Sequence, residues 1–346
     1  MSGFLIIFLI VLCQYGYNQL IYPWRDSDPE TPWNIERVFN GHYKGTDFPA
    51  NVNIAIIDSY IDTSLPDLQG QVKWVYDTRQ IITNSCTYLN TFAHGTFIAG
   101  IIGAARDGKG IVGINPIANL YSIVTTWTET TSTVGPQTCW KFIKNGIIAA
   151  VNGPDGIAGT EDDTDIINLS YHGDNSSQLF LDYLPELHDA IKYAYNHNVV
   201  IVAPTGNIND NLLINNTVWP AAFSEVIAVG ATDINDNLAS FSNTGPFVEV
   251  VAPGVDIEST FNGTNIDQSC YICTKEGVVT SSGTSFAVAH VVGIISLIIA
   301  KYGKLPIGNF NDFNSSTIRG ILHSTAIDLG DKGYDMKYGY GLVQFE

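Results

Sequence analysis

Apolar runs that alternate between strand-like and helix-like constrain the fold of this chain more than any other feature. Short runs typical of buried strands occur at 54–57, 120–124, 166–169, 199–203, 226–230 and 248–251. Longer runs typical of helices lie at 95–103, 139–151, 185–197, 284–301 and 315–324. Strands that alternate with helices pair in parallel, with the helices on both faces of the sheet. The sequence therefore predicts an α/β fold with a mostly parallel sheet.

The charge balance limits the kinds of partner. The 346 residues include 34 acidic but only 16 basic side chains, for a formal net charge of −18. Such a charge disfavours nucleic acid and anionic membranes as partners. It suits a soluble extracellular protein. We expect a monomer, with no stable membrane partner unless an N-terminal anchor is retained.

The N-terminus differs from the rest of the chain. Phe4 to Cys13 is an uninterrupted apolar stretch, which has the length of a signal-peptide core and is short for a membrane span. We predict a signal peptide or N-terminal anchor at 1–16, an N-terminal extension at 17–45 and one domain at 46–346. Cleavage would release a secreted protein, whereas retention would leave it anchored to the membrane on the extracellular side.

Cysteine usage supports export. Beyond the N-terminal stretch the cysteines are Cys86, Cys139, Cys270 and Cys273. An even number in an exported protein favours two disulfide bonds, for which three pairings are possible. Free thiols are one alternative. Another is that Cys270 and Cys273, spaced as Cys-x-x-Cys, form half of a zinc site or a redox pair.

Three polar residues stand where an apolar strand ends or a helix begins. Asp58 ends the first apolar strand, His94 opens a run punctuated by glycines, and Ser285 follows Gly-Thr at the start of a long apolar helix. Each alone has a structural explanation, as a turn residue, a helix cap or a loop serine. Together they form a set used for nucleophilic catalysis, because a serine hydroxyl needs a base to remove its proton.

The motifs around these residues resemble those of the subtilisin-like serine proteases, the subtilases, over residues 46–346. The matching motifs are Ile56-Ile57-Asp58-Ser59, His94-Gly95-Thr96, Ala203-Pro204-Thr205-Gly206-Asn207 and Gly283-Thr284-Ser285. The resemblance implies a three-layer subtilisin-like fold and a serine endopeptidase that cleaves polypeptides through an acyl-enzyme. It assigns Ser285 as nucleophile, His94 as general base, Asp58 as the group that orients the imidazole, and Asn207 as an oxyanion donor.

The resemblance also implies an S1 pocket, which holds P1, the substrate side chain before the cleaved bond. Its walls and floor are assigned to Ser170, Tyr171, His172, Gly173, Ala203, Pro204, Gly206 and Val218. An apolar floor at Val218 offers no partner to a buried Lys or Arg, so we predict cleavage after large apolar or aromatic residues. We expect His172 to be a wall residue rather than a second base. The segment 125–129 is expected to be an edge strand that pairs with the substrate.

A structural calcium ion is a further expectation from the resemblance. Asp67 and Asp107 align with side-chain ligands, although Lys109 beside them is unfavourable. Calcium needs about six to eight oxygen ligands, many of them backbone carbonyls that a sequence cannot show. The acidic insert at 153–165 is a second candidate, for which a solvated loop is the alternative.

Two other functions compete with a secreted protease. One is a membrane-tethered processing protease, which retention of the N-terminal segment would favour. The other is a catalytically silent subtilase fold that acts as a binding protein, and the presence of all four chemical residues argues against it. Three positions depart from the family pattern, namely Tyr60 in place of the usual glycine, Phe97 in place of a frequent histidine, and Ala289 in place of a common proline.

Overall fold

The computed structural model describes residues 21–22, 31–41, 51–78, 93–125, 137–173, 178–207, 217–261 and 277–345. The predicted segment 1–16, most of the predicted edge strand, and Cys86, Cys270 and Cys273 lie outside these ranges. Cys139 belongs to a described helix, but its side chain is also outside the description. The disulfide bonds therefore stay a prediction.

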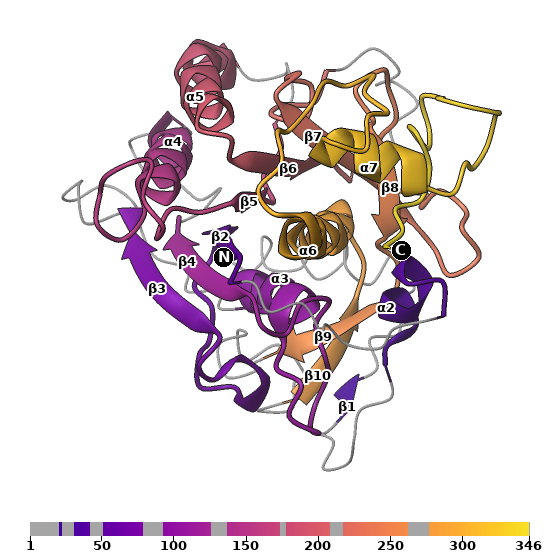
Figure 1. Cartoon of the computed structure of the whole chain (residues 1–346), viewed down its shortest axis with the longest axis horizontal. Helices are drawn as coiled ribbons and strands as arrows, with labels where there is room; N and C mark the ends of the chain where they lie inside the picture. Colours follow the sequence, from indigo (N-terminus) through magenta and orange to yellow (C-terminus); the bar gives the residue numbers. More distant parts are fainter. Residues whose placement is uncertain are drawn as a thin grey trace, which may run out of the picture.

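A seven-stranded parallel sheet forms the centre of the molecule, in the order β3-β4-β2-β5-β6-β7-β8 (Figure 1). The strands are β2 (Asn53–Asp58), β3 (Val72–Asp77), β4 (Asn119–Val124), β5 (Ile166–Leu169), β6 (Val200–Pro204), β7 (Val226–Thr232) and β8 (Val250–Pro253). Strands β2, β5, β6 and β7 are buried along their whole length, as parallel strands covered on both faces should be. The predicted α/β fold with a mostly parallel sheet is confirmed.

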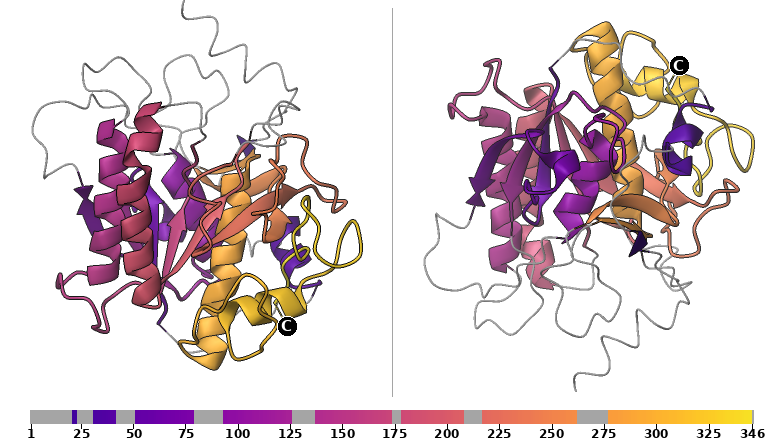
Figure 2. Two further views of the ribbon diagram at one scale, coloured as in Figure 1. Left: turned by 90° about the horizontal axis from the view of Figure 1, so that it is seen from above. Right: turned by 90° about the horizontal axis from the view of Figure 1, so that it is seen from below.

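Helices cover both faces of this sheet and complete three layers (Figure 2). On one face α4 (Gln137–Asn152) packs over β2 and β4, and α5 (Gln178–Asn196) packs over β6. On the other face lie α3 (Ala93–Gly103) and α6 (Thr284–Tyr302). Each face has its own cluster of buried apolar side chains, so the sheet separates two cores.

Helix α6 is the centre of the second core. Every residue from Thr284 to Ile299 is buried, and the helix contacts β5, β6, β7 and β8. Its length and apolar composition would suffice to cross a membrane, but 89% of its apolar window is buried inside the protein. The Thr284 N–H donates to Asn207, which lies just beyond the end of β6. This bond places the start of α6, and with it Ser285, at the carboxyl edge of the sheet.

The remaining elements of the described chain are shorter. They are β1 (Ile21–Tyr22), α2 (Trp33–Val38), the 3-10 helix η1 (Pro66–Leu68), β9 (Ile257–Phe261), β10 (Gly277–Ser281) and α7 (Ile318–Thr325). Strands β1, β10 and β9 form a separate antiparallel sheet, and β10 leads into α6. Helix α2 is held by two bonds of 2.8 Å from Arg37 to Asp236 and by a 2.9 Å bond from the Phe345 N–H to the Val38 carbonyl. Part of the 17–45 segment is thus packed against the main body.

The predicted strands and helices are present, but some boundaries and elements differ. Helix α5 begins at Gln178 and contains Pro185, whereas the sequence prediction started this helix at 185. Helix α7 begins at Ile318 instead of 315, because the Thr317 hydroxyl caps it by accepting the Gly320 N–H at 3.1 Å. Strand β3 was not predicted, since its positions alternate between partly buried and exposed and lack an apolar run.

The buried serine in the middle of α6 makes a testable contribution to stability. The Ser296 hydroxyl accepts a 2.9 Å hydrogen bond from Asn115 Nδ2 and donates one of 2.7 Å to the Gly293 carbonyl. Ser296→Ala leaves the buried Asn115 amide unsatisfied and should lower the free energy of unfolding by about 1–3 kcal/mol in urea denaturation. Ser315→Ala, at an exposed serine, is the control and should stay within about 0.5 kcal/mol of wild type. Equal losses in both variants would contradict this reading.

Candidate active site

Asp58 and His94 meet at the carboxyl edge of the sheet. Asp58 is the last residue of β2 and is only 4% exposed, and His94 lies in the first turn of α3. His94 Nδ1 lies 2.8 Å from Oδ2 and 3.0 Å from Oδ1 of Asp58, and the Ser59 N–H also donates to Oδ1 at 2.6 Å. A carboxylate only accepts hydrogen bonds, so Nδ1 carries a hydrogen and Nε2 is the nitrogen left to act as a base.

The pair also changes how readily His94 takes up a proton. Burial by itself would lower the pKa of His94, but the negative charge of Asp58 and its hydrogen bond both raise it. The net result is a pKa above the ordinary value of 6.5. The side chain remains 40% exposed, so the ring is accessible to a reacting group.

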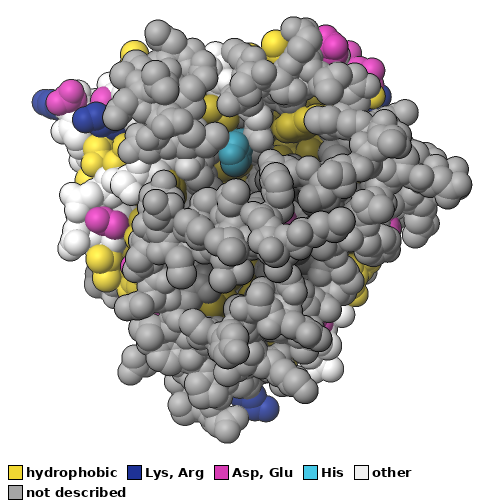
Figure 3. All heavy atoms as spheres, turned by 180° about the vertical axis from the view of Figure 1, so that it is seen from behind, with side chains coloured by type: hydrophobic (Ala, Val, Ile, Leu, Met, Phe, Trp, Pro, Cys, Tyr) yellow, Lys and Arg dark blue, Asp and Glu magenta, His cyan; other side chains and the backbone are white. Residues whose placement is uncertain are grey.

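Ser285 begins α6 next to this pair. The Phe286 ring lies 5.9 Å from the His94 ring and 4.3 Å from the Phe97 ring, between centroids, and these contacts pack the first turn of α6 onto α3. Ser285 is 8% exposed. Figure 3 looks onto the face on which α6 begins, where a histidine ring is exposed beside apolar side chains. The structure thus brings the serine and histidine motifs together from separate helices, although no hydrogen bond joins Ser285 to His94 among the described residues.

Asn207 is oriented by the residue that precedes the serine. Its Oδ1 accepts hydrogen bonds from the Thr284 N–H at 2.8 Å and the Thr284 hydroxyl at 2.7 Å. A backbone N–H can only donate, so the accepting atom must be the amide oxygen and the side-chain orientation is determined. The Nδ2 group consequently points away from Thr284, and it donates to no other described residue.

The residues assigned to S1 lie where β5 and β6 end. Ser170, Tyr171, His172 and Gly173 follow β5, Ala203, Pro204 and Gly206 end or follow β6, and Val218 is buried, at 4% exposed. The Tyr171 hydroxyl shares a hydrogen bond with the Thr125 hydroxyl, and the Thr125 N–H donates to the Asp58 carbonyl at 2.8 Å. The wall after β5 is therefore linked to the end of β2.

One contact near the serine could not be found from the sequence. Asn34 on α2 donates from Nδ2 to His290 Nε2 at 2.8 Å, across 256 positions of chain, while His290 Nδ1 donates to the Phe286 carbonyl at 2.7 Å. Both side chains are fully buried, and burial lowers the pKa of His290 to about 4. Asn34 lies in an extension with no catalytic motif, so no sequence signal marks it.

Asp67 and Asp107, assigned to calcium, lie in neighbouring segments. Asp67 is fully buried; its Oδ2 accepts the Ile111 N–H at 2.8 Å, and its Oδ1 has no hydrogen-bond partner in the described part of the chain. Burial raises the pKa of Asp67 to about 7, against the Ile111 hydrogen bond and with help from the charge of Asp107. A Cβ at Gly110 would collide with both carboxylate oxygens, so only glycine leaves this carboxylate room.

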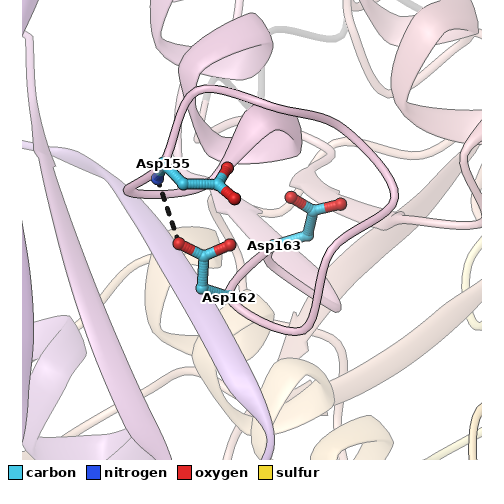
Figure 4. A group of neighbouring side chains, drawn as sticks. All are labelled: Asp155, Asp162 and Asp163. Atoms are coloured by element: carbon cyan, nitrogen blue, oxygen red, sulfur yellow. Dashed lines mark hydrogen bonds between the residues drawn. The ribbon is translucent and has the colours of Figure 1, made fainter.

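The acidic insert brings three carboxylates together (Figure 4). Oxygens of Asp155, Asp162 and Asp163 all lie within 4.8 Å of one another. The loop itself supplies hydrogen-bond donors to them, including the Asp155 N–H to Asp162 at 3.0 Å. Asp163 likewise accepts the N–H groups of Gly159 and Thr160. A loop that satisfies its own carboxylates needs no ion, so this cluster by itself does not indicate a metal site.

Known proteins resemble this chain along most of its length. Residues 50–341 match the model of the subtilase family. The chain is 33% identical to Subtilisin DY of Bacillus licheniformis, over 88% of this chain and 91% of that protein. It is 30% identical to Minor extracellular protease Epr of Bacillus subtilis, over 92% of this chain and 42% of that protein. These matches confirm the resemblance inferred from the motifs.

A solved structure has the same architecture. Fervidolysin from Fervidobacterium pennivorans, a keratinolytic enzyme related to subtilisin, matches with a TM-score of 0.67 and 27% identity. The match covers 92% of this chain and 46% of fervidolysin, so the chain spans about half the length of that protein. The three-layer subtilisin-like fold expected from the motifs is confirmed.

His94 and His290 should titrate on opposite sides of the ordinary histidine pKa of 6.5. The raised pKa of His94 means that its contribution to stability is complete below 6.5 and is lost as pH rises through its folded pKa. The lowered pKa of His290 means that stability is complete above 6.5 and falls by roughly 3 kcal/mol as pH drops toward about 4. NMR titration of the imidazole carbons checks both directions, with His94→Ala and His290→Gln to assign the signals. Titration of His290 near 6.5 would contradict its neutral, buried state.

Proposed function

The chain belongs to the subtilase family and is a serine endopeptidase, and we propose that Asp58, His94 and Ser285 carry out its peptide-bond hydrolysis. The observation that carries the proposal is the Asp58–His94 pair beside the start of α6. It supplies an oriented base next to a serine at a helix N-terminus. Polypeptides are the substrates.

In the first half-reaction Ser285 Oγ attacks the carbonyl carbon of the scissile bond. His94 Nε2 takes the hydroxyl proton during the attack, because the hydroxyl is a weak nucleophile without a base. The tetrahedral intermediate collapses, His94 gives the proton to the departing amine, and the acyl group stays on Ser285. In the second half-reaction His94 takes a proton from water, which attacks the acyl carbon, and returns it to Ser285 Oγ as the carboxylic acid product leaves.

Asp58 serves this cycle by holding His94 in one tautomer. The two Asp58 oxygens within 3.0 Å of Nδ1 support this role, because they keep the hydrogen on Nδ1 and the lone pair on Nε2. The carboxylate also stabilises the imidazolium formed after proton transfer and does not itself need to take the proton.

Asn207 stabilises the negative oxygen of the tetrahedral intermediate, together with the Ser285 N–H. The support is the pair of hydrogen bonds from Thr284, which hold the amide oxygen and leave Nδ2 as a preset donor beside the nucleophile. A donor that is oriented before the reaction costs no reorganisation during it, and removing one typically lowers kcat by about 10²–10³.

The S1 pocket takes an apolar P1 side chain. Val218, assigned to the pocket floor, is buried, and Pro204 is assigned to a wall. Neither residue offers a charged partner to a Lys or Arg side chain at P1. The enzyme acts outside the cell, with the apolar stretch from Phe4 to Cys13 as its export signal. The name of the related extracellular protease Epr and the net charge of −18 support this location.

A calcium ion fits the segment at Asp67, where the residues present suit a hard cation. The fully buried Asp67 carboxylate has one oxygen with no hydrogen-bond partner among the described residues, and Gly110 leaves space beside it. Asp67 and Asp107 would hold the ion, with carbonyl oxygens of the same loops. Calcium there would neutralise a buried negative charge and join η1 to the loop after α3, which is a structural rather than a catalytic contribution.

The assignment of the nucleophile is tested by covalent labelling and by combined variants. A fluorophosphonate probe should label wild type and Ser282→Ala but not Ser285→Ala. Ser285→Ala and His94→Ala should each remove nearly all peptidase activity, and the double variant should lose little more, because members of a catalytic unit are strongly non-additive. Losses that multiply independently, or labelling that survives Ser285→Ala, would refute the assignment.

The calcium proposal is tested by thermal stability instead of activity. EDTA should lower the Tm of wild type, since an ion bound only by the folded state at 100 times its Kd stabilises by about 2.7 kcal/mol. Asp107→Ala should remove this sensitivity, and Asp155→Ala, in the acidic insert, should keep it. An EDTA effect that disappears in Asp155→Ala would show that the ion binds in the acidic insert instead. The absence of any EDTA effect in wild type would contradict the calcium site at Asp67.

A further inference from the structure

We propose that His172 limits the size of the P1 side chain that this endopeptidase accepts. The proposal rests on the proposed function, because it concerns the same S1 pocket. From the sequence, His172 is expected in a pocket wall. The position of its ring makes it a specificity-determining residue, which acts by filling space that a large P1 side chain would need.

The S1 pocket is a slot between two backbone segments. Strands β5 and β6 pair as far as Asn168 and Val202, and within the described residues no ladder pair joins 170–173 to 203–206 beyond that point. At the far end of the slot, Gly173 and Trp219 exchange two backbone hydrogen bonds of 2.8 Å each. A P1 side chain therefore enters between the two segments and meets a closed end.

The imidazole of His172 faces Gly206 across this slot. Its Cδ2 and Cγ atoms lie 3.3 and 3.6 Å from the position that a Cβ would take on Gly206, in the opposite segment. The gap between the ring and the facing backbone therefore has room for about one added carbon atom. An inserted aromatic ring would need about 3.5–4.0 Å between its own carbon atoms and the atoms on each side. With His172 in this position, the slot is too narrow for such a ring.

The opposite segment is held in place by Asn243. Asn243 donates from its backbone N–H to the Gly206 carbonyl at 3.1 Å and from Nδ2 to the Thr205 carbonyl at 2.9 Å. Gly206 has a φ of +94°, which glycine adopts without strain, and a Cβ there would lie 2.7 Å from Asn243 Nδ2. Because this wall is bonded to a buried side chain, its distance from the His172 ring sets the width of the slot.

The slot with His172 in place suits small side chains. An alanine side chain is a single carbon atom and fits this gap, whereas a phenylalanine ring needs a wider gap than the His172 ring leaves. The accepted P1 side chains are therefore smaller than the large apolar and aromatic ones expected from the floor at Val218 alone. Val218 sets the apolar character of the pocket, and His172 limits its size.

The test uses peptides that differ only at P1, with Ala, Val, Phe, Asp or Lys, at high ionic strength. Wild type should cleave after Ala at least about 10-fold more efficiently, in kcat/KM, than after Phe. His172→Gly should shift the Phe-to-Ala ratio by about 10-fold or more toward Phe. His172→Ala is a second variant with an ordinary backbone preference. The control His197→Ala, at an exposed histidine just after α5, should leave the ratio unchanged.

Three outcomes have distinct meanings. A wild-type preference for Phe that persists in His172→Gly overturns the size limit. A preference for Asp that disappears in His172→Gly and weakens as pH rises also overturns it, because His172 would then recognise charge. Fluorophosphonate labelling of Ser285 in each protein separates these results from failure of the proposed function. A labelled enzyme with the wrong P1 profile contradicts only the role of His172, and a protein that neither labels nor cleaves contradicts both proposals.

Discussion

The packing of the first turn of α6 against α3 is the interaction on which the rest of the site depends. Phe286 is 6% exposed and contacts the rings of both His94 and Phe97, so the residue after the serine is in contact with the histidine of the other helix. Apolar contact of this kind has no direction of its own. The relative position of Ser285 and His94 therefore also needs polar contacts that admit only one arrangement.

Three asparagines provide such contacts along α6. Asn207 bonds Thr284 at its start, Asn34 bonds His290 nearly two turns further on, and Asn115 bonds Ser296 in its second half. They come from the segment after β6, from α2 and from the loop after α3. A buried polar group that loses its partner costs more than an apolar contact of similar size. A sliding or rotated α6 would lose all three bonds together, and this restricts the helix to one register.

The residues proposed to form the substrate pocket lie at the same carboxyl edge of the sheet. Parallel strands place their ends side by side, so segments that follow β2, β4, β5 and β6 converge although they are far apart in the chain. The proposed S1 slot lies where β5 and β6 stop pairing. The bond between Tyr171 and Thr125 links this slot to the Asp58 backbone, so pocket and base are built on one rigid frame.

The sequence by itself determined the sheet, the major helices and the motifs around Asp58, His94 and Ser285, because buried strands, a buried helix and short motifs are local patterns. It did not determine β3 or the start of α5, where an amphipathic edge strand and an internal Pro185 obscure those patterns. Only the tertiary structure decided that Asn34 bonds His290 and that the His172 ring faces Gly206. Both contacts join segments whose separation is set by how the sheet and helices pack, and no local pattern in a chain records a distance across its core.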